Sequence, residues 1–182
     1  PYIKKYTEER ELIVMLAVDV SASTFYGTNI GLKCDTLIEL ASVISFSAIK
    51  NNDKVGLLLF SDKVEKYIPP KKGKIHVLRV IRELISYKSN NKSTDIKLGL
   101  DHLHKVIKRK SIIFLLSDFF DISFHQSMKL INKKHDLINI EILDPAETNI
   151  FDLGFVKYND EDSNTSYWLD TSNNKYRNDI DN

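Results

Sequence analysis

The sequence predicts an α/β fold with a doubly wound, mainly parallel central sheet and helices on both of its faces. Continuous aliphatic runs, such as "LIVMLAVDV" at residues 12–20, alternate along the chain with segments whose apolar residues recur at helical spacing. The runs lack the alternation of a strand with one solvated face, which indicates that both faces of the sheet are covered. The chain has 182 residues, 42% of them hydrophobic, which is enough for one domain with a well-buried core.

Four of the aliphatic runs predict buried strands, and one further segment predicts an antiparallel edge strand. The segment "KVEKYIPP" at residues 63–70 alternates polar and apolar residues and ends in two prolines. Proline cannot donate a hydrogen bond to a neighbouring strand, so this segment is expected at the sheet edge, in a hairpin with the preceding strand. The buried strands are expected at residues 12–20, 54–62, 111–119 and 137–144.

The segments between the strands predict amphipathic helices. Residues 33–50, for example, place Leu37 and Ile44 at helical spacing. Another helix is expected to begin at Thr94 or Asp95, because either side chain offers an N-cap. The helices are expected at residues 33–50, 74–88, 94–109 and 123–135.

The two ends of the chain differ from this alternating middle. Residues 155–170 predict a C-terminal hairpin at the sheet edge, with Trp168 packed against a helix, and the last residues predict a short helix or a frayed end. The first residue is Pro1, so we expect a fragment of a longer protein. We treat the fragment as a single domain, with a leading segment at 1–10, a core at 11–170 and a tail at 171–182.

Composition narrows the class of protein. The formal net charge is +1 with no basic stripe, which argues against nucleic-acid binding. The single cysteine, Cys34, permits no internal disulfide and fits a reducing compartment. The longest apolar run, at residues 12–18, is far shorter than the roughly 20 residues that cross a bilayer. We expect a cytoplasmic domain, and tethering to a membrane through a segment outside this sequence stays open.

Oxygen-bearing side chains collect where predicted strands end. Asp19, Ser21 and Ser23 follow the first strand, Asp118 follows a later one, and Thr94 precedes a helix. Ligands of open α/β sheets bind at the carboxyl ends of the strands. Two carboxylates and three hydroxyls suit a hard divalent cation such as Mg²⁺. Taken alone, the first three residues are equally compatible with an ordinary polar turn.

The same residues resemble a known family. "DVSAS" at 19–23 is similar to the D-x-S-x-S signature of von Willebrand factor A-type domains, "KSTDIKLGL" to their threonine loop, and "LLSDFF" to their aspartate loop. Residues 5 to 170 together resemble the bacterial von Willebrand A-like family known as domain of unknown function 58. The resemblance implies a von Willebrand A or Rossmann-like fold.

The resemblance also implies a metal-ion-dependent adhesion site for Mg²⁺ or Mn²⁺. Ser21 and Ser23 would bind the metal through their hydroxyls, and Thr94 would bind it directly or through water. Asp19 and Asp118 would hold metal-bound waters, which leaves one position open for a Glu or Asp of a partner protein.

Two positions depart from the family pattern. Lys92 and Ser93 precede the threonine, where many such domains have glycine, and Phe119 and Phe120 follow Asp118, where glycine is common. Glycine would allow a tight turn and a close approach of the partner. We expect one of the two phenylalanines in the core and the other on an exposed rim that contacts the partner.

The histidines have simpler explanations than metal binding. His102 and His104 lie two residues apart on a predicted helix and therefore point to different faces. His76, His125 and His135 are scattered and are expected at the surface or at helix ends.

The leading functional hypothesis is a protein-interaction module without enzymatic activity. The resemblance implies a partner in a MoxR-type AAA+ ATPase or its client, in a chaperone-like assembly system. One alternative is a Mg²⁺-dependent hydrolase or phosphotransferase, although Ser21 lies where the second Asp of a phosphoaspartate enzyme would be. The other alternative is a scaffold that keeps the fold and binds no metal.

Overall fold

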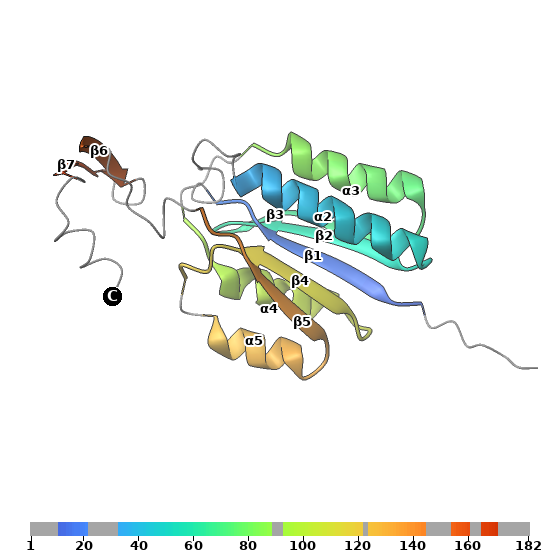
Figure 1. Ribbon diagram of the computed structural model, residues 1–182. Helices are drawn as coiled ribbons and strands as arrows, with labels where there is room; N and C mark the ends of the chain where they lie inside the picture. The colour runs from blue at the N-terminus through green and yellow to red at the C-terminus, as the bar shows by residue number, and fades with distance from the viewer. Residues whose placement is uncertain are drawn as a thin grey trace, which may run out of the picture.

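The computed structural model describes residues 11–21, 33–88, 93–121, 124–144, 154–160 and 165–170. Within these residues, a five-stranded sheet lies between helices on both faces (Figure 1). Its strands are β1 (Ile13–Asp19), β2 (Lys54–Phe60), β3 (Val64–Lys71), β4 (Ile112–Ser117) and β5 (Asp136–Glu141). The helices are α2 (Lys33–Lys50), α3 (Lys74–Ser86), α4 (Ile96–Val106) and α5 (His125–Asn132).

The strand order is β3-β2-β1-β4-β5. Strand β1 pairs in parallel with β2 and β4, β4 pairs in parallel with β5, and β3 is antiparallel to β2 at one edge. The chain therefore winds outward from β1 in both directions, and this confirms the predicted doubly wound sheet with one antiparallel edge strand. In such a sheet, the carboxyl ends of β1, β2 and β4 lie side by side.

Two apolar layers hold the helices to the sheet. Leu16 and Leu57 face α2 and α3, whereas Leu58 and Leu115 face α4 and α5, and all four are fully buried. Burying an aliphatic side chain of this size contributes roughly 1.5–3 kcal/mol, so the continuous aliphatic runs stabilise both layers at once.

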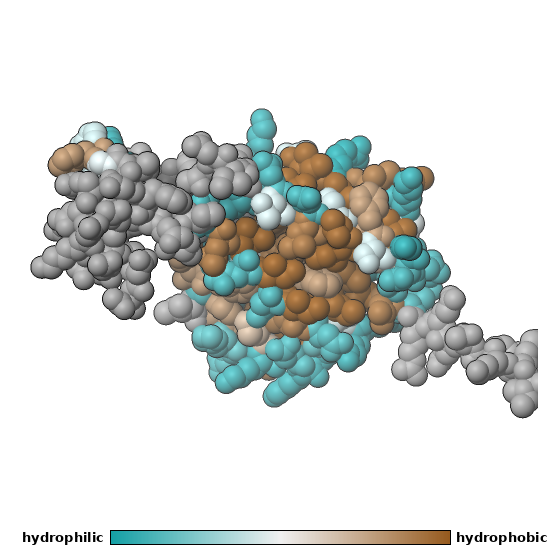
Figure 2. Space-filling view, in the orientation of Figure 1, coloured by the Kyte–Doolittle hydropathy of each residue, from teal (hydrophilic) through white to brown (hydrophobic). Residues whose placement is uncertain are grey.

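The layer beneath α2 thins towards β5. Phe114 and Ile140 are only partly buried, and Val43 on α2 and Ile138 on β5 are exposed. Figure 2 shows the resulting apolar surface over this side of the molecule. The cause is that α2 and α3 both lie over the β1, β2 and β3 half of the sheet (Figure 1).

Helix α4 begins at Ile96, because Asp95, one of the two caps that the sequence predicts, is its N-cap. The Asp95 backbone is non-helical, at φ −133°, and its Oδ1 accepts a hydrogen bond from the Leu98 amide at 2.8 Å. Gly99 then lets the helix lie close to the sheet, since a Cβ there would come within 2.9 Å of the Phe60 ring. Thr94 immediately precedes the cap.

The predicted hairpin is present as β6 (Phe155–Asp160) and β7 (Thr165–Asp170), paired antiparallel. It forms a two-stranded sheet of its own and does not extend the five-stranded sheet. Trp168 is 69% exposed, so the expectation that it packs against a helix is wrong. The segments 1–10 and 171–182 lie outside the described residues.

His135 lies just past the end of α5, one of the two kinds of position expected for it, but it is buried, at 1% exposed. Its amide donates to the Ile131 carbonyl of α5, and the next amide, of Asp136, donates to the Ser111 carbonyl before β4. These two hydrogen bonds hold His135 between α5 and the five-stranded sheet. In the part of the chain that the structure describes, no helix combines the length and the apolar character that crossing a membrane requires.

Candidate metal site at the carboxyl edge of the sheet

Backbone hydrogen bonds bring the predicted site segments to one edge of the sheet. The Val20 amide donates to the Phe60 carbonyl at 2.8 Å, which extends the β1–β2 pairing past Asp19. The Asp95 amide donates to the Ser61 carbonyl at 2.9 Å, which places the loop before α4 at the end of β2. Asp19, Ser21, Thr94 and Asp118 therefore lie at the same edge, as the sequence predicts.

Asp19 is fully buried and held through both of its carboxylate oxygens. Its Oδ1 accepts from the Ser21 amide at 3.0 Å, and its Oδ2 accepts from the Ser117 hydroxyl at 2.7 Å. Burial raises the pKa of Asp19, the hydrogen bonds from Ser21 and Ser117 oppose that rise, and the charge of Asp118 adds to it. A buried carboxylate with a raised pKa beside a second carboxylate is an arrangement that a bound cation relieves.

Asp118 carries the observation that best fits a bound cation. It is 3% exposed, and its Oδ1 accepts a long hydrogen bond, 3.4 Å, from the Phe120 amide. Its Oδ2 is buried and has no hydrogen-bond partner among the described residues. Leaving a buried carboxylate oxygen without a donor is costly, so a cation or a metal-bound water fits this position.

The structure describes two of the three residues whose hydroxyls are candidate metal ligands. The side chain of Ser21 is buried next to Asp19, and Thr94 is half-buried just before the α4 cap. Ser23 lies outside the described residues, so its predicted role stays a prediction. Among the residues that are described, no group of three or more His, Cys, Asp or Glu could hold a metal, so the candidate site relies on hydroxyls with two carboxylates.

Two residues contribute to the site in ways that the sequence reasoning missed. Ser117 links the two carboxylate loops, because its Oγ donates to Asp19 and accepts from the Phe119 amide at 3.2 Å. Asp121 accepts a hydrogen bond through Oδ2 from the Ile96 amide at 3.1 Å. The only sequence signal for Asp121 is a carboxylate three residues after Asp118.

The two phenylalanines divide as predicted. Phe119 packs on the core beneath α4 and α5, with its ring 5.7 Å from that of Phe124. Phe120 is 66% exposed, and the Lys33 ammonium lies 5.8 Å from its ring centre. Phe119 has φ 57°, a left-handed backbone that favours glycine, at the position where the family commonly has glycine. The Phe119 backbone thus makes the turn that glycine would allow, and its side chain packs on the core.

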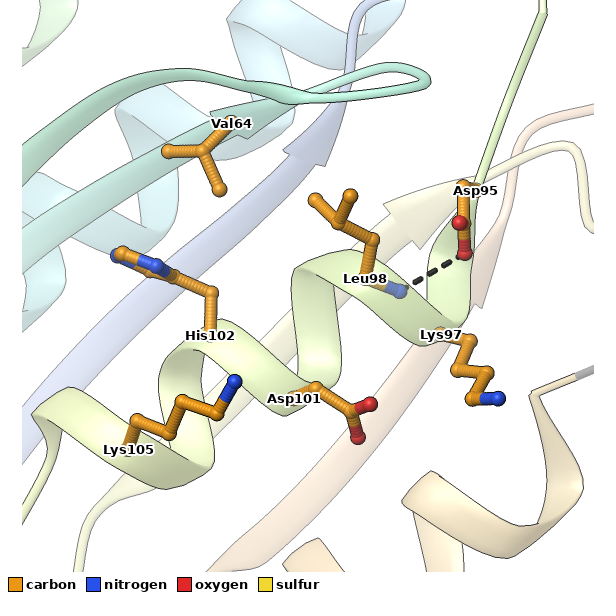
Figure 3. Close-up of a pocket in the computed structure, with 7 residues that line it drawn as sticks. All are labelled: Val64, Asp95, Lys97, Leu98, Asp101, His102 and Lys105. Atoms are coloured by element: carbon orange, nitrogen blue, oxygen red, sulfur yellow. Dashed lines mark hydrogen bonds between the residues drawn. The ribbon is translucent and has the colours of Figure 1, made fainter.

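A shallow pocket of about 370 Å³ lies between α4 and the start of β3 (Figure 3). Neither Asp19, Ser21 nor Asp118 lines it, so it is separate from the candidate metal site. Its lining residues are Val64, Asp95, Lys97, Leu98, Asp101, His102 and Lys105.

The strand order and the edge that gathers these oxygens define a von Willebrand A-like α/β domain. The chain belongs to the family described as "Protein of unknown function DUF58", whose model matches residues 1–182. It is 26% identical over 166 residues to an uncharacterized protein of Mycobacterium bovis, a match that covers 90% of this chain and 52% of that protein. An uncharacterized protein of Mycobacterium tuberculosis matches with the same values, so the chain spans about half the length of the curated relatives it matches.

Solved structures share the fold at low sequence identity. An aerotolerance-related membrane protein from Bacteroides fragilis superposes with a TM-score of 0.67 at 14% identity, over 93% of this chain and 86% of that one. The conserved hypothetical protein BatB from Bacteroides thetaiotaomicron gives a TM-score of 0.64 at 16% identity, over 93% and 84%. Proximal thread matrix protein 1 from the mussel byssus gives 0.57 at 19% identity, over 72% and 37%.

Proposed function

We propose that this domain is a non-enzymatic interaction module that holds Mg²⁺ or Mn²⁺ and, through the metal, binds an acidic side chain of a partner protein. The observation that carries the proposal is the Asp118 Oδ2 atom, which is buried and has no donor within the described part of the chain. It lies at the edge where Asp19 is also buried, and the charge of Asp118 adds to the rise that burial causes in the pKa of Asp19.

The residues that would hold the metal are those that the sequence predicts: Ser21, Ser23 and Thr94 through hydroxyls, and Asp19 and Asp118 through waters. Neutral hydroxyl ligands leave much of the cation's charge uncompensated, so the bound metal would attract a further carboxylate. The chain's own contribution is to fix the carboxylates, and Ser117 does this for Asp19. Phe120, exposed beside Asp118, would add apolar contact with the partner.

A MoxR-type AAA+ ATPase, or a client of that ATPase, is the partner that the family resemblance suggests. The resemblance alone supports this choice of partner. Co-purification of the ATPase with the full-length protein, in Mg²⁺ but not in EDTA, is the expected result.

The metal-bridged mode can be tested without knowing the partner. N-acetyl-glutamate amide carries the required carboxylate, and N-acetyl-glutamine amide is its neutral match. If an open metal position accepts a carboxylate, the glutamate compound tightens Mn²⁺ binding and Mn²⁺ equally tightens binding of the compound, because coupling between two ligands is reciprocal. The glutamine compound leaves Mn²⁺ affinity unchanged.

Two results would contradict the proposal. Mn²⁺ binding that responds equally to both compounds would indicate a closed metal site. Absence of Mn²⁺ binding would favour the metal-free scaffold, in which Asp19→Ala leaves partner binding intact. The alternative of a Mg²⁺-dependent hydrolase would be favoured by metal-dependent hydrolysis of a phosphate ester that Ser21→Ala abolishes.

A further inference from the structure

Asp121 joins the two loops that carry candidate metal residues. It lies three residues after Asp118, in the loop that follows β4, and its Oδ2 accepts a hydrogen bond from the Ile96 amide at 3.1 Å. Ile96 is the first residue of α4 and lies two residues after Thr94. One hydrogen bond therefore bridges the threonine loop and the aspartate loop.

This contact is a second cap on α4, supplied from a different part of the chain. The first amides of a helix have no partner within the helix. Asp95 satisfies the Leu98 amide from within its own loop, whereas Asp121 satisfies the Ile96 amide from across the site. A carboxylate at a helix N-terminus is also favoured by the helix dipole. The two caps are therefore similar in kind and differ in what they connect.

We propose that Asp121 is a positioning residue for the metal site, which holds the Thr94 loop at its distance from Asp118. The proposal rests on the metal-dependent function proposed above. The hydroxyl of Thr94 and the carboxylate of Asp118 come from separate loops. Strand β4 places the second, the Asp95 amide ties the first to the end of β2, and the Asp121 hydrogen bond joins the two loops directly. The Ile96 side chain is fully buried, so the amide that donates to Asp121 belongs to a residue packed in the core.

The expected effect is on metal affinity more than on stability. Residues that orient metal ligands without touching the metal typically change affinity by about 10–100-fold when they are removed. Asp121→Ala removes the acceptor and is expected to weaken Mn²⁺ binding within that range. Asp121→Asn keeps an acceptor oxygen for the Ile96 amide and is expected to bind Mn²⁺ close to wild type.

Asp95→Ala is the matched control, because it removes the other cap of the same helix. Loss of one cap is expected to lower the thermal midpoint by roughly 2–4 °C in either alanine variant. Only Asp121→Ala is expected to lose Mn²⁺ affinity in addition, since Asp95 does not connect the two loops. Hydrogen exchange at the Ile96 amide, slow in wild type and faster in Asp121→Ala, checks that the bond is present in solution.

A double-mutant cycle assigns the effect to the threonine loop. In a Thr94→Ala background, Asp121→Ala is expected to cost less Mn²⁺ affinity than in wild type, because the hydroxyl that it positions is already gone. Equal Mn²⁺ affinity of Asp121→Ala and wild type would overturn the proposal, and so would an equal loss in Asp95→Ala. Absence of Mn²⁺ binding in wild type would instead overturn the proposed function, and this inference with it.

Discussion

At the residue scale, Asp19 is a buried carboxylate whose ionisation is opposed by burial and by Asp118, and the proposed metal would relieve that cost. Both of its oxygens accept hydrogen bonds, yet burial and Asp118 still raise its pKa above 3.8. A group whose folded-state pKa lies above its unfolded value contributes stability that is complete below the unfolded pKa and is lost as the pH rises through the folded pKa. At neutral pH the charged Asp19 therefore opposes folding of the metal-free domain.

Asp19→Asn is accordingly expected to raise the thermal midpoint of the metal-free domain at pH 7. Asparagine keeps an acceptor for the Ser21 amide and removes the buried charge beside Asp118. With saturating Mg²⁺ the order is expected to reverse, because only wild type gains the stability of bound metal. Thermal melts in EDTA and in Mg²⁺ measure the midpoints of the two proteins without and with metal. A midpoint in EDTA that is lower for Asp19→Asn than for wild type would contradict this account.

His135 gives the domain a separate sensitivity to acid. The side chain is buried, neither ring nitrogen has a partner within the described residues, and burial, followed by Lys134, lowers its pKa. A lowered pKa means that its contribution to stability is complete above about 6.5, the ordinary value for histidine. That contribution is lost as the pH falls below 6.5 towards the folded-state pKa, because the unfolded chain then binds the extra proton.

His135→Leu is therefore expected to flatten the loss of stability between about pH 6.5 and 5. Urea unfolding across that range measures the effect. His125→Leu, at an exposed position on α5, is the control and is expected to follow wild type. A His135→Leu variant that loses stability with acid as steeply as wild type would show that His135 does not titrate on unfolding.

At the element scale, strands β1, β2 and β4 and both ends of α2 could be predicted from the sequence, whereas the start of α4 could not. Strand β5 was expected to be buried, and most of its residues are exposed. Strands β1, β2 and β4 match the aliphatic runs because burial on both faces leaves no choice of residue. The start of α4 depends on whether Thr94 or Asp95 takes the cap, and only the Asp95 to Leu98 hydrogen bond decides it. Local pattern carries no information about such a choice.

The candidate site residues also divide into those that could be predicted from the sequence and those that could not. Asp19, Ser21, Thr94 and Asp118 were predictable because each follows a strand or precedes a helix at one sheet edge. Asp121 was not, because its partner, the Ile96 amide, is a backbone group that leaves no signal in the sequence. The left-handed backbone of Phe119 was equally hidden, since phenylalanine rarely adopts it.

Gly99→Ala tests how closely α4 must approach the sheet. Alanine improves helix propensity by about 1 kcal/mol, but its Cβ would lie 2.9 Å from the fully buried Phe60 ring. Overpacking a core costs roughly 1–3 kcal/mol, so the variant is expected to lose about 1 kcal/mol of unfolding free energy. Urea titration measures this change in unfolding free energy. Ser47→Ala, on the exposed face of α2, is the control for the effect of helix propensity alone. A more stable Gly99→Ala variant would contradict the packing.

At the scale of the whole molecule, the sheet brings segments that are far apart in the sequence to one edge. Asp19 and Ser117 are 98 residues apart in sequence and share a 2.7 Å hydrogen bond. Any ligand that binds this edge stabilises the folded state as a unit, by about 2.7 kcal/mol at a concentration 100 times its dissociation constant. Metal binding and global stability should therefore change together.

The most direct test is a calorimetric titration of the domain with Mn²⁺, beside Ser21→Ala and Ser45→Ala. Ser45 is a matched buried serine whose hydroxyl donates to the Ala41 carbonyl within α2, away from the site. The account predicts saturable binding to wild type and Ser45→Ala, and none to Ser21→Ala. No binding to wild type, or equal binding to Ser21→Ala, would contradict it.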